Sequence, residues 1–171
     1  MSTQLNIRPE CPEDIFRVYS LNTSAFETYA EARLVDRLRE EADPIISLVA
    51  DLEGEIAGQI LFSPVTIDDH PDLLLMGLAP MAVRPEHQRQ GIGTALVHAG
   101  LEACRDMGVV GAVVLGHPEF YPRFDFVPAS QFDIGCEYDV PDEVFMALEL
   151  KSGVFSRISG VARYHSAFAD L

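Results

Sequence analysis

The stretch from residue 83 to residue 96, VRPEHQRQGIGTAL, constrains the fold of this chain more than any other. An apolar strand ends at Val83, a polar turn follows, and Gly91 and Gly93 open an amphipathic helix. The first backbone N–H groups of such a helix have no intrahelical partners, and the helix dipole is positive there. Glycine has no Cβ to hold a phosphate away from these groups. The stretch therefore predicts a phosphate or pyrophosphate site, with tight packing of the turn as the alternative.

Two common nucleotide motifs do not fit this stretch. A Walker A loop needs Lys-Ser or Lys-Thr after the second glycine, and none follows Gly93. A dinucleotide fingerprint needs a third small residue where Leu96 stands, and the next strand ends in Leu115-Gly116 without an acid. The chain also has no Gly-x-Ser-x-Gly elbow, which argues against a serine hydrolase.

Composition narrows the function classes further. The net charge of −15 over 171 residues argues against general nucleic-acid binding. Residues 1–80 hold 5 basic and 15 acidic side chains, whereas residues 81–130 hold 4 and 5. This distribution suits an anionic cofactor and a cationic amine, although acidity can also simply keep a protein soluble. The three cysteines lack metal-ligand spacing, and no apolar run reaches membrane-spanning length, so we expect a cytoplasmic protein with no metal and no membrane partner.

The order of elements predicts an α/β fold with a mixed sheet. A strand at Leu5–Arg8 precedes a helix that begins at Pro12 and a second helix over Tyr29–Glu41. One further helix is predicted at Gly91–Met107. The predicted strands are Ile45–Asp51, Glu55–Ile67, Leu73–Val83, Val109–Leu115 and Phe145–Leu150, and Val161–Phe168 is predicted as a strand or an extended tail. Pro80 lies inside one of these strands and cannot donate to a sheet ladder. It therefore predicts a bulge, an edge or a place where neighbouring strands part.

The pattern Val-x-Pro-x-x-Gln-x-x-Gly-x-Gly, from Val83 to Gly93, resembles the acetyl-CoA-binding motif of the GNAT superfamily of N-acetyltransferases. The resemblance implies one GNAT domain over residues 1–171, with residues 131–171 as its C-terminal strands and tail. It also implies a central twisted sheet whose two parallel strands splay apart around the cofactor, with flanking helices. Acetyl-CoA is the implied cosubstrate. The backbone of Met81, Ala82 and Val83 would contact pantetheine, and the amides of Arg89, Gln90, Gly91, Ile92, Gly93 and Thr94 would hold the pyrophosphate.

A second motif follows the Val109–Leu115 strand. GNAT enzymes commonly carry a tyrosine there, then three residues, a glycine and a phenylalanine. Tyr121 and Phe126 match this spacing, but Asp125 occupies the glycine position, which predicts an altered turn. A phenol stays protonated at neutral pH and can hand a proton to a departing thiolate, so Tyr121 is the predicted general acid. The alternative is a core aromatic whose hydroxyl is hydrogen-bonded.

These features predict an acetyl-CoA-dependent N-acetyltransferase that transfers acetyl directly to a primary amine in a ternary complex. The acceptor, a small molecule or a peptide, is not specified, and a homodimer is possible for this superfamily. A non-catalytic acetyl-CoA sensor or scaffold is the alternative. We assign no general base, because the strand before the glycine turn holds no acid. The candidates for that role are Glu27, Glu31, His117 and Glu119, and those for contacts to CoA phosphates are Arg84, Arg89 and Arg123.

Overall fold

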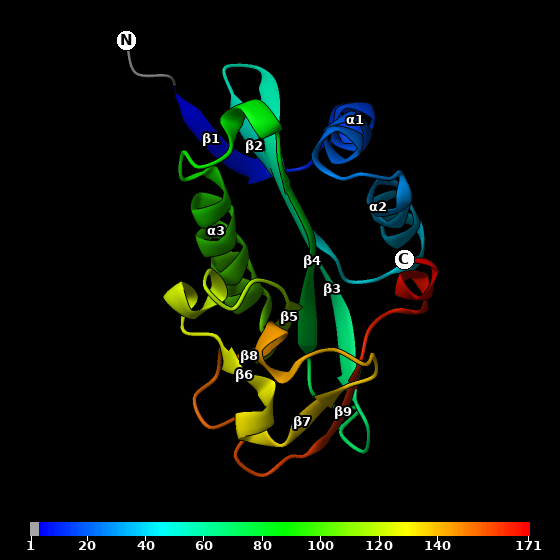
Figure 1. Ribbon diagram of the computed structural model, residues 1–171, viewed down its shortest axis with the longest axis vertical. Coiled ribbons are helices and arrows are strands. Elements are labelled where there is room, and N and C mark those ends of the chain that lie inside the picture. Colours follow the sequence, from blue (N-terminus) through cyan, green and yellow to red (C-terminus); the bar gives the residue numbers. More distant parts are fainter. Residues whose placement is uncertain (1–3) are drawn as a thin grey trace.

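The computed structural model describes residues 4–171 and shows a central sheet with α1 and α2 on one face and α3 on the other (Figure 1). The helices are α1 (Ile15–Ala25), α2 (Ala30–Glu41) and α3 (Ile92–Met107). The strands are β1 (Leu5–Pro9), β2 (Ile46–Leu52), β3 (Glu55–Ile67), β4 (Leu75–Val83), β5 (Gly111–Leu115), β6 (Val127–Pro128), β7 (Ile134–Cys136), β8 (Phe145–Glu149) and β9 (Gly160–Arg163). No helix in the described part of the chain is long and apolar enough to cross a membrane.

The sheet is mixed, as the sequence predicts. Its strand order is β1-β2-β3-β4-β5-β8-β6, and every neighbouring pair on this path is antiparallel except β4 and β5. The parallel pair is joined by α3, because a parallel connection needs a crossover that returns the chain to the same end of the sheet. At the margin, β9 pairs antiparallel with β3 and parallel with β7.

Two hydrophobic clusters cover the two faces of the sheet. In β5, Val113 belongs to the cluster under α1 and α2, whereas Ala112 and Val114 belong to the cluster under α3. This split follows from the alternation of side chains along a strand. The central strand β5 therefore reads as a continuous apolar run, since both of its faces are buried.

The parallel strands β4 and β5 part halfway along β4. They are paired only from Leu75 opposite Gly111 to Leu78 opposite Val114, although β4 continues to Val83. The ladder between β3 and β4 is also irregular here. Ile60 faces Met81 and Phe62 faces Leu78, so that Ala79 and Pro80 of β4 stand opposite the single residue Leu61 of β3, and β4 has one extra residue. Pro80 has no N–H to contribute to a ladder. The predicted interruption at Pro80 is confirmed as a bulge at the point where the central strands separate.

The later part of the chain differs from the sequence prediction in detail. Strand β8 forms where it was expected, but β9 ends at Arg163, and a 3₁₀ turn at Ser166–Asp170 replaces the predicted strand or tail to Phe168. The imidazole of His165 accepts a hydrogen bond from the Ala167 N–H at 3.0 Å and so begins that turn. The short strands β6 and β7 were not predicted, because two or three residues are too few to show a periodicity.

The start of α1 is fixed to the sheet by a buried carboxylate. Asp14 is 3% exposed and accepts two hydrogen bonds from the Arg8 guanidinium, at 2.7 and 3.0 Å, and one from the Cys11 N–H at 2.7 Å. Arg8 also donates to Asp51 of β2 at 3.2 Å. These bonds hold the pKa of Asp14 below its usual range, chiefly through the hydrogen bonds from Arg8.

We expect Asp14→Asn to destabilise the protein by about 1.5–3 kcal/mol at neutral pH, the range for hydrogen bonds to charged groups. The lowered pKa means that the carboxylate stabilises the fold fully above its unfolded pKa of about 3.9, and that this stabilisation is lost as the pH falls through the lower folded pKa. Urea unfolding of both proteins at a series of pH values measures the difference. A gap in unfolding free energy that stays constant down to about pH 2 would contradict this account.

Candidate functional site

A cavity of about 1190 Å³ occupies the gap where β4 and β5 part. One wall is the glycine turn and the first residues of α3, and a second is the segment that follows β5. The third wall contains Phe26 and Glu31, which come from the α1–α2 region. The lining draws on both hydrophobic clusters, since Met81 and Tyr121 pack with the α3 face and Phe26 and Ala79 pack with the α1–α2 face. The cavity therefore passes through the sheet from one face to the other.

The glycine turn presents free backbone donors to this cavity. Gly91 is the residue before α3 and has a left-handed φ of 88°, which favours glycine. The first intrahelical bond runs from the Ala95 N–H to the Gly91 carbonyl at 3.0 Å, so the N–H groups of Ile92, Gly93 and Thr94 have no acceptor within the helix. Their position at the positive end of a helix makes this wall suited to an anion.

Packing does not explain the glycine at position 93. A Cβ there would lie 3.7 Å from the Met81 side chain and 3.8 Å from the Phe120 ring, which are ordinary contact distances. A Cβ on Gly91 would meet nothing within 4 Å. The turn therefore leaves open space beside the free donors, and the tight-packing alternative loses its support.

The exposed edge of β4 contributes the next part of the wall. The Arg84 N–H donates to the Ala57 carbonyl at 2.8 Å, and Ala82 faces Gln59 two residues earlier. Because hydrogen bonding alternates along an antiparallel pair, the Ala82 peptide points to β3, and the peptides of Met81 and Val83 point into the gap. The geometry thus favours Met81 and Val83 over Ala82 for the predicted backbone contacts with pantetheine. Met81 and Val83 also line the cavity, whereas Ala82 does not.

The predicted phosphate arginines separate into two groups. Arg89, with a left-handed φ of 63°, and Arg123, stacked 5.6 Å over the Phe120 ring, both line the cavity. Arg84 does not; its Nε donates to the Ile56 carbonyl at 3.0 Å. Gln90 also lies outside the lining and donates to the Glu86 carbonyl at 3.4 Å.

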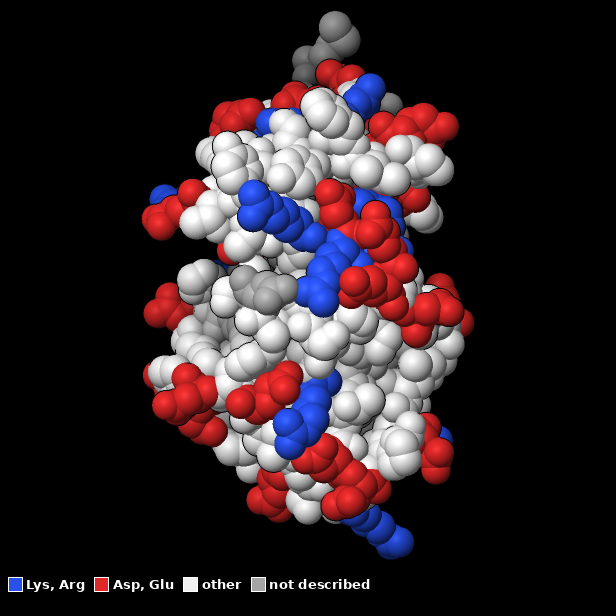
Figure 2. Space-filling model, turned by 90° about the vertical axis from the view of Figure 1, so that its right-hand side faces the viewer, with Lys and Arg blue, Asp and Glu red and all other residues white. Residues whose placement is uncertain are grey.

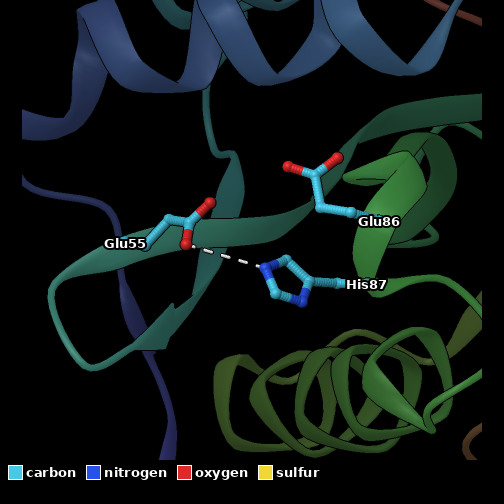
Figure 3. Close-up of side chains that lie close together, drawn as sticks. All are labelled: Glu55, Glu86 and His87. Carbon is cyan, nitrogen blue, oxygen red and sulfur yellow. Dashed lines mark ion pairs between the residues drawn. The ribbon is translucent and has the colours of Figure 1, made fainter.

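A cluster of Glu55, Glu86 and His87 lies beside the glycine turn (Figure 3). The His87 Nε2 is 3.6 Å from a Glu55 oxygen, and the Arg84 Nε is 3.5 Å from the other oxygen of the same carboxylate. The three potential ligand atoms lie within 4.8 Å of one another, but the Arg84 guanidinium already supplies positive charge to Glu55. We therefore interpret Glu55 as the partner of Arg84, whose hydrogen bonds to the Ile56 and Ala57 carbonyls hold the start of the turn against β3.

Tyr121 lies on the second wall, at the start of a 3₁₀ helix (Tyr121–Phe124). Its ring is only 6% exposed and makes edge-on contacts with Phe120 and Phe126, with centroids 5.0 and 5.8 Å away. No hydrogen-bond partner of its hydroxyl is found among the described residues, although the side chain borders the cavity. Burial raises the pKa of Tyr121 to about 12, so the hydroxyl is protonated at neutral pH. The alternative of a core tyrosine with a satisfied hydroxyl is not what the structure shows.

The position of the Tyr121 ring depends on Gly116. The sequence did not identify Gly116 as a residue of the site. A Cβ on Gly116 would lie 2.2 Å from the ring, closer than real contacts allow. Any side chain at this position would displace the ring from the cavity wall. A glycine at the end of a buried strand is the sequence signal, but the identity of its neighbour depends on how the chain folds back.

Asp125, for which the sequence predicts an altered turn, adopts a backbone conformation that glycine favours. Its φ is 73°, in the left-handed region where a glycine commonly sits, and its N–H donates to the Pro122 carbonyl at 3.1 Å. Aspartate tolerates this region better than most side chains do. The turn therefore keeps the glycine-like backbone, and Phe126 still reaches the ring of Tyr121.

The candidate bases also occupy different places. Glu31 lines the cavity, and its Oε2 is buried without a hydrogen-bond partner. His117 and Glu119 line the cavity but are exposed. Glu27 is exposed and lies outside the lining.

Comparison with known proteins agrees with this geometry. The family model described as "Acetyltransferase (GNAT) family" matches residues 13–126. The uncharacterized N-acetyltransferase YhbS of Escherichia coli strain K12 is 36% identical over 163 residues, which cover 95% of this chain and 97% of YhbS. A second uncharacterized N-acetyltransferase of that strain, YjhQ, is 40% identical over 134 residues, covering 76% of this chain and 74% of YjhQ.

Two solved structures are also similar. The crystal structure of YhbS from Escherichia coli in complex with CoA has a TM-score of 0.93 at 32% identity, over 99% of this chain and 94% of that one. A GNAT acetyltransferase from Brucella melitensis in complex with acetyl-CoA has a TM-score of 0.81 at 31% identity, over 98% and 99% of the two chains. With its splayed parallel strands, its glycine turn and these relatives, the chain belongs to the GNAT family of acetyltransferases.

Proposed function

We propose that this protein binds acetyl-CoA and transfers the acetyl group directly to a primary amine held in the same cavity. The observation that supports this most is the cavity itself. It joins the free amides of α3, the open edge of β4 and the unpartnered Tyr121 hydroxyl within one space between the parting strands. The CoA and acetyl-CoA complexes of the two similar structures support the same ligand.

The residues present fit such a ligand. Position 93 has room beside it, and the N–H groups of Ile92, Gly93 and Thr94 would hold the pyrophosphate, with Arg89 and Arg123 near enough to the cavity to add positive charge. The Met81 backbone groups and the Val83 N–H, which have no strand partner on the gap side, would bind the amides of pantetheine; the Val83 carbonyl already accepts a hydrogen bond from the Gln88 side chain at 3.1 Å. In this way the ligand would take the place of the missing strand between β4 and β5.

Acetyl-CoA supplies a thioester carbonyl, which the neutral amine attacks. A backbone N–H of the open β4 edge would stabilise negative charge on the carbonyl oxygen, an effect that is strong in a site that excludes water. Tyr121 would donate its hydroxyl proton toward the sulfur as the carbon–sulfur bond breaks. The neutral amine contributes the electron pair of the new carbon–nitrogen bond, and its nitrogen then loses one proton, which replaces the proton that Tyr121 gives to the sulfur. The products are the amide and CoA as a thiol.

The raised pKa of Tyr121 determines how it would act. A thiol has an ordinary pKa of about 8.5, so complete transfer of a proton from a phenol of pKa about 12 to a free thiolate costs about 5 kcal/mol. We therefore expect Tyr121 to act first as a hydrogen-bond donor to the sulfur, with full transfer only when the amine loses its own proton. The high pKa also keeps Tyr121 in its donating form over the whole physiological pH range.

Calorimetric titration with acetyl-CoA tests the ligand. We expect micromolar affinity, roughly −8 kcal/mol, and no binding of NAD or ATP. Gly93→Glu should abolish this binding by filling the open space with negative charge, while the fold is retained because an acid near a helix N-terminus is favourable.

Two variants serve as controls for this titration. Gly93→Gln has the same size without the charge and should weaken binding less. Gly108→Ala at the other end of α3 replaces a left-handed glycine with a φ of 91°, so it should cost about 1 kcal/mol of stability but leave acetyl-CoA affinity unchanged. Normal affinity in Gly93→Glu would refute the proposed pyrophosphate site.

Tyr121→Phe tests the proposed acid. With an amine that supports turnover in a panel, kcat should fall by roughly 10²–10⁴, whereas acetyl-CoA affinity stays the same. Since the protonated phenol is the active form and its pKa is about 12, ionisation of Tyr121 should not lower the wild-type kcat anywhere between about pH 7 and pH 10. An unchanged kcat in the variant would mean that Tyr121 only packs in the core. If the wild type acetylates no amine of the panel, an acetyl-CoA sensor would be favoured over an enzyme.

A further inference from the structure

Glu31 is a carboxylate in the cavity wall for which the described residues provide no hydrogen-bond or ion-pair partner. It lies in the first turn of α2 and lines the cavity together with Phe26. Its Oε2 atom is buried and accepts no hydrogen bond. Taking a carboxylate oxygen out of water without a partner is costly, so such a group is expected to meet a donor or a cation when the site is filled.

Of the other acids on α2, Asp36 and Glu41 are paired and Glu40 is exposed to water, so a buried oxygen without a partner distinguishes Glu31 from them. Asp36 is 2.8 Å from an Arg39 nitrogen, and Glu41 is 3.0 Å from an Arg37 nitrogen. Figure 2 shows the face that carries α1 and α2, where acidic side chains are spread widely and basic ones run across the middle. No ion pair of Glu31 is found among the described residues. The positive charge that would balance Glu31 is therefore expected from a ligand.

The position of Glu31 indicates which positive charge this is. Glu31 belongs to the wall on the α1–α2 side of the sheet, whereas Tyr121 packs in the cluster on the α3 side. A carboxylate also stabilises a neighbouring ammonium in its charged form, and the nitrogen that attacks the thioester must be neutral. Glu31 is thus better placed to hold a cation that does not react than to hold the reacting nitrogen.

We propose that Glu31 is the specificity residue of the acceptor site and that the acceptor is a primary amine carrying a second positive charge at some distance from the first. This inference rests on the proposed function and adds the substrate class to it. The second cation would pair with Glu31 beside Phe26, while the first amine, deprotonated, would reach the thioester through the gap between β4 and β5.

Three five-carbon amines that differ only in the far group test this proposal: cadaverine with a second ammonium, pentylamine with a methyl group and δ-aminovalerate with a carboxylate. Acetyl transfer and binding to the protein saturated with acetyl-CoA are measured for each. We expect kcat/KM for cadaverine to exceed that for pentylamine by about 10-fold or more, mainly through KM, the size expected for a hydrogen bond to a charged group. δ-Aminovalerate should be the poorest of the three.

Glu31→Gln should remove this preference without changing acetyl-CoA affinity, and Glu31→Lys should shift it toward δ-aminovalerate. Glu27→Gln, at an exposed position outside the lining, is the matched control and should keep the wild-type order. The proposal is overturned if the wild type neither binds nor acetylates cadaverine better than pentylamine, or if Glu31→Gln keeps the preference. Failure of the wild type to bind acetyl-CoA would instead refute the proposed function.

Discussion

The parting of β4 and β5 is the constraint on which the rest of the structure depends. One extra residue in β4, where Ala79 and Pro80 stand opposite Leu61, breaks its ladder with β3, and beyond Leu78 the strand is not paired with β5. Unpaired backbone groups within a protein are costly unless water or a ligand satisfies them. The fold therefore carries an open edge at its centre, and the cavity lies where no strand among the described residues pairs with that edge.

The parting of β4 and β5 also determines what the positive end of the α3 dipole faces. The chain leaves β4 at Val83, makes a turn that Arg84 holds to β3 by hydrogen bonds to the Ile56 and Ala57 carbonyls, and enters α3 at Ile92. A crossover helix between parallel strands begins at the end where the first strand stops. Here that is also the end where the strands have separated, so the free amides of α3 face the gap. One local irregularity in the sheet thus brings a helix terminus and an open strand edge to the same cavity.

Features that depend on the local backbone could be predicted from the sequence, and features that depend on how distant segments meet could not. Pro80 and the glycine turn express their effect within a few residues, which is why the bulge and the helix start were predictable. The fit of the Tyr121 ring over Gly116 and the approach of Glu31 to the cavity are set by packing between separate elements. Asp125 shows that a departure from a sequence motif does not by itself predict a different backbone. It stands where the motif has glycine, yet it adopts a left-handed φ that glycine commonly adopts.

The two faces of the sheet carry different chemical groups because one cavity crosses between them. On the α3 face are free amides, Arg89 and Arg123, which suit an anionic ligand, and Tyr121, whose hydroxyl stays protonated. On the α1–α2 face is Glu31, whose unpaired oxygen suits a cation. If both faces of the cavity carried the same charge, one of two oppositely charged ligands would be repelled, and the two could not bind next to each other. The acidity of residues 1–80 beside the nearly neutral residues 81–130 agrees with the proposed division of the cavity between acetyl-CoA and a cationic amine.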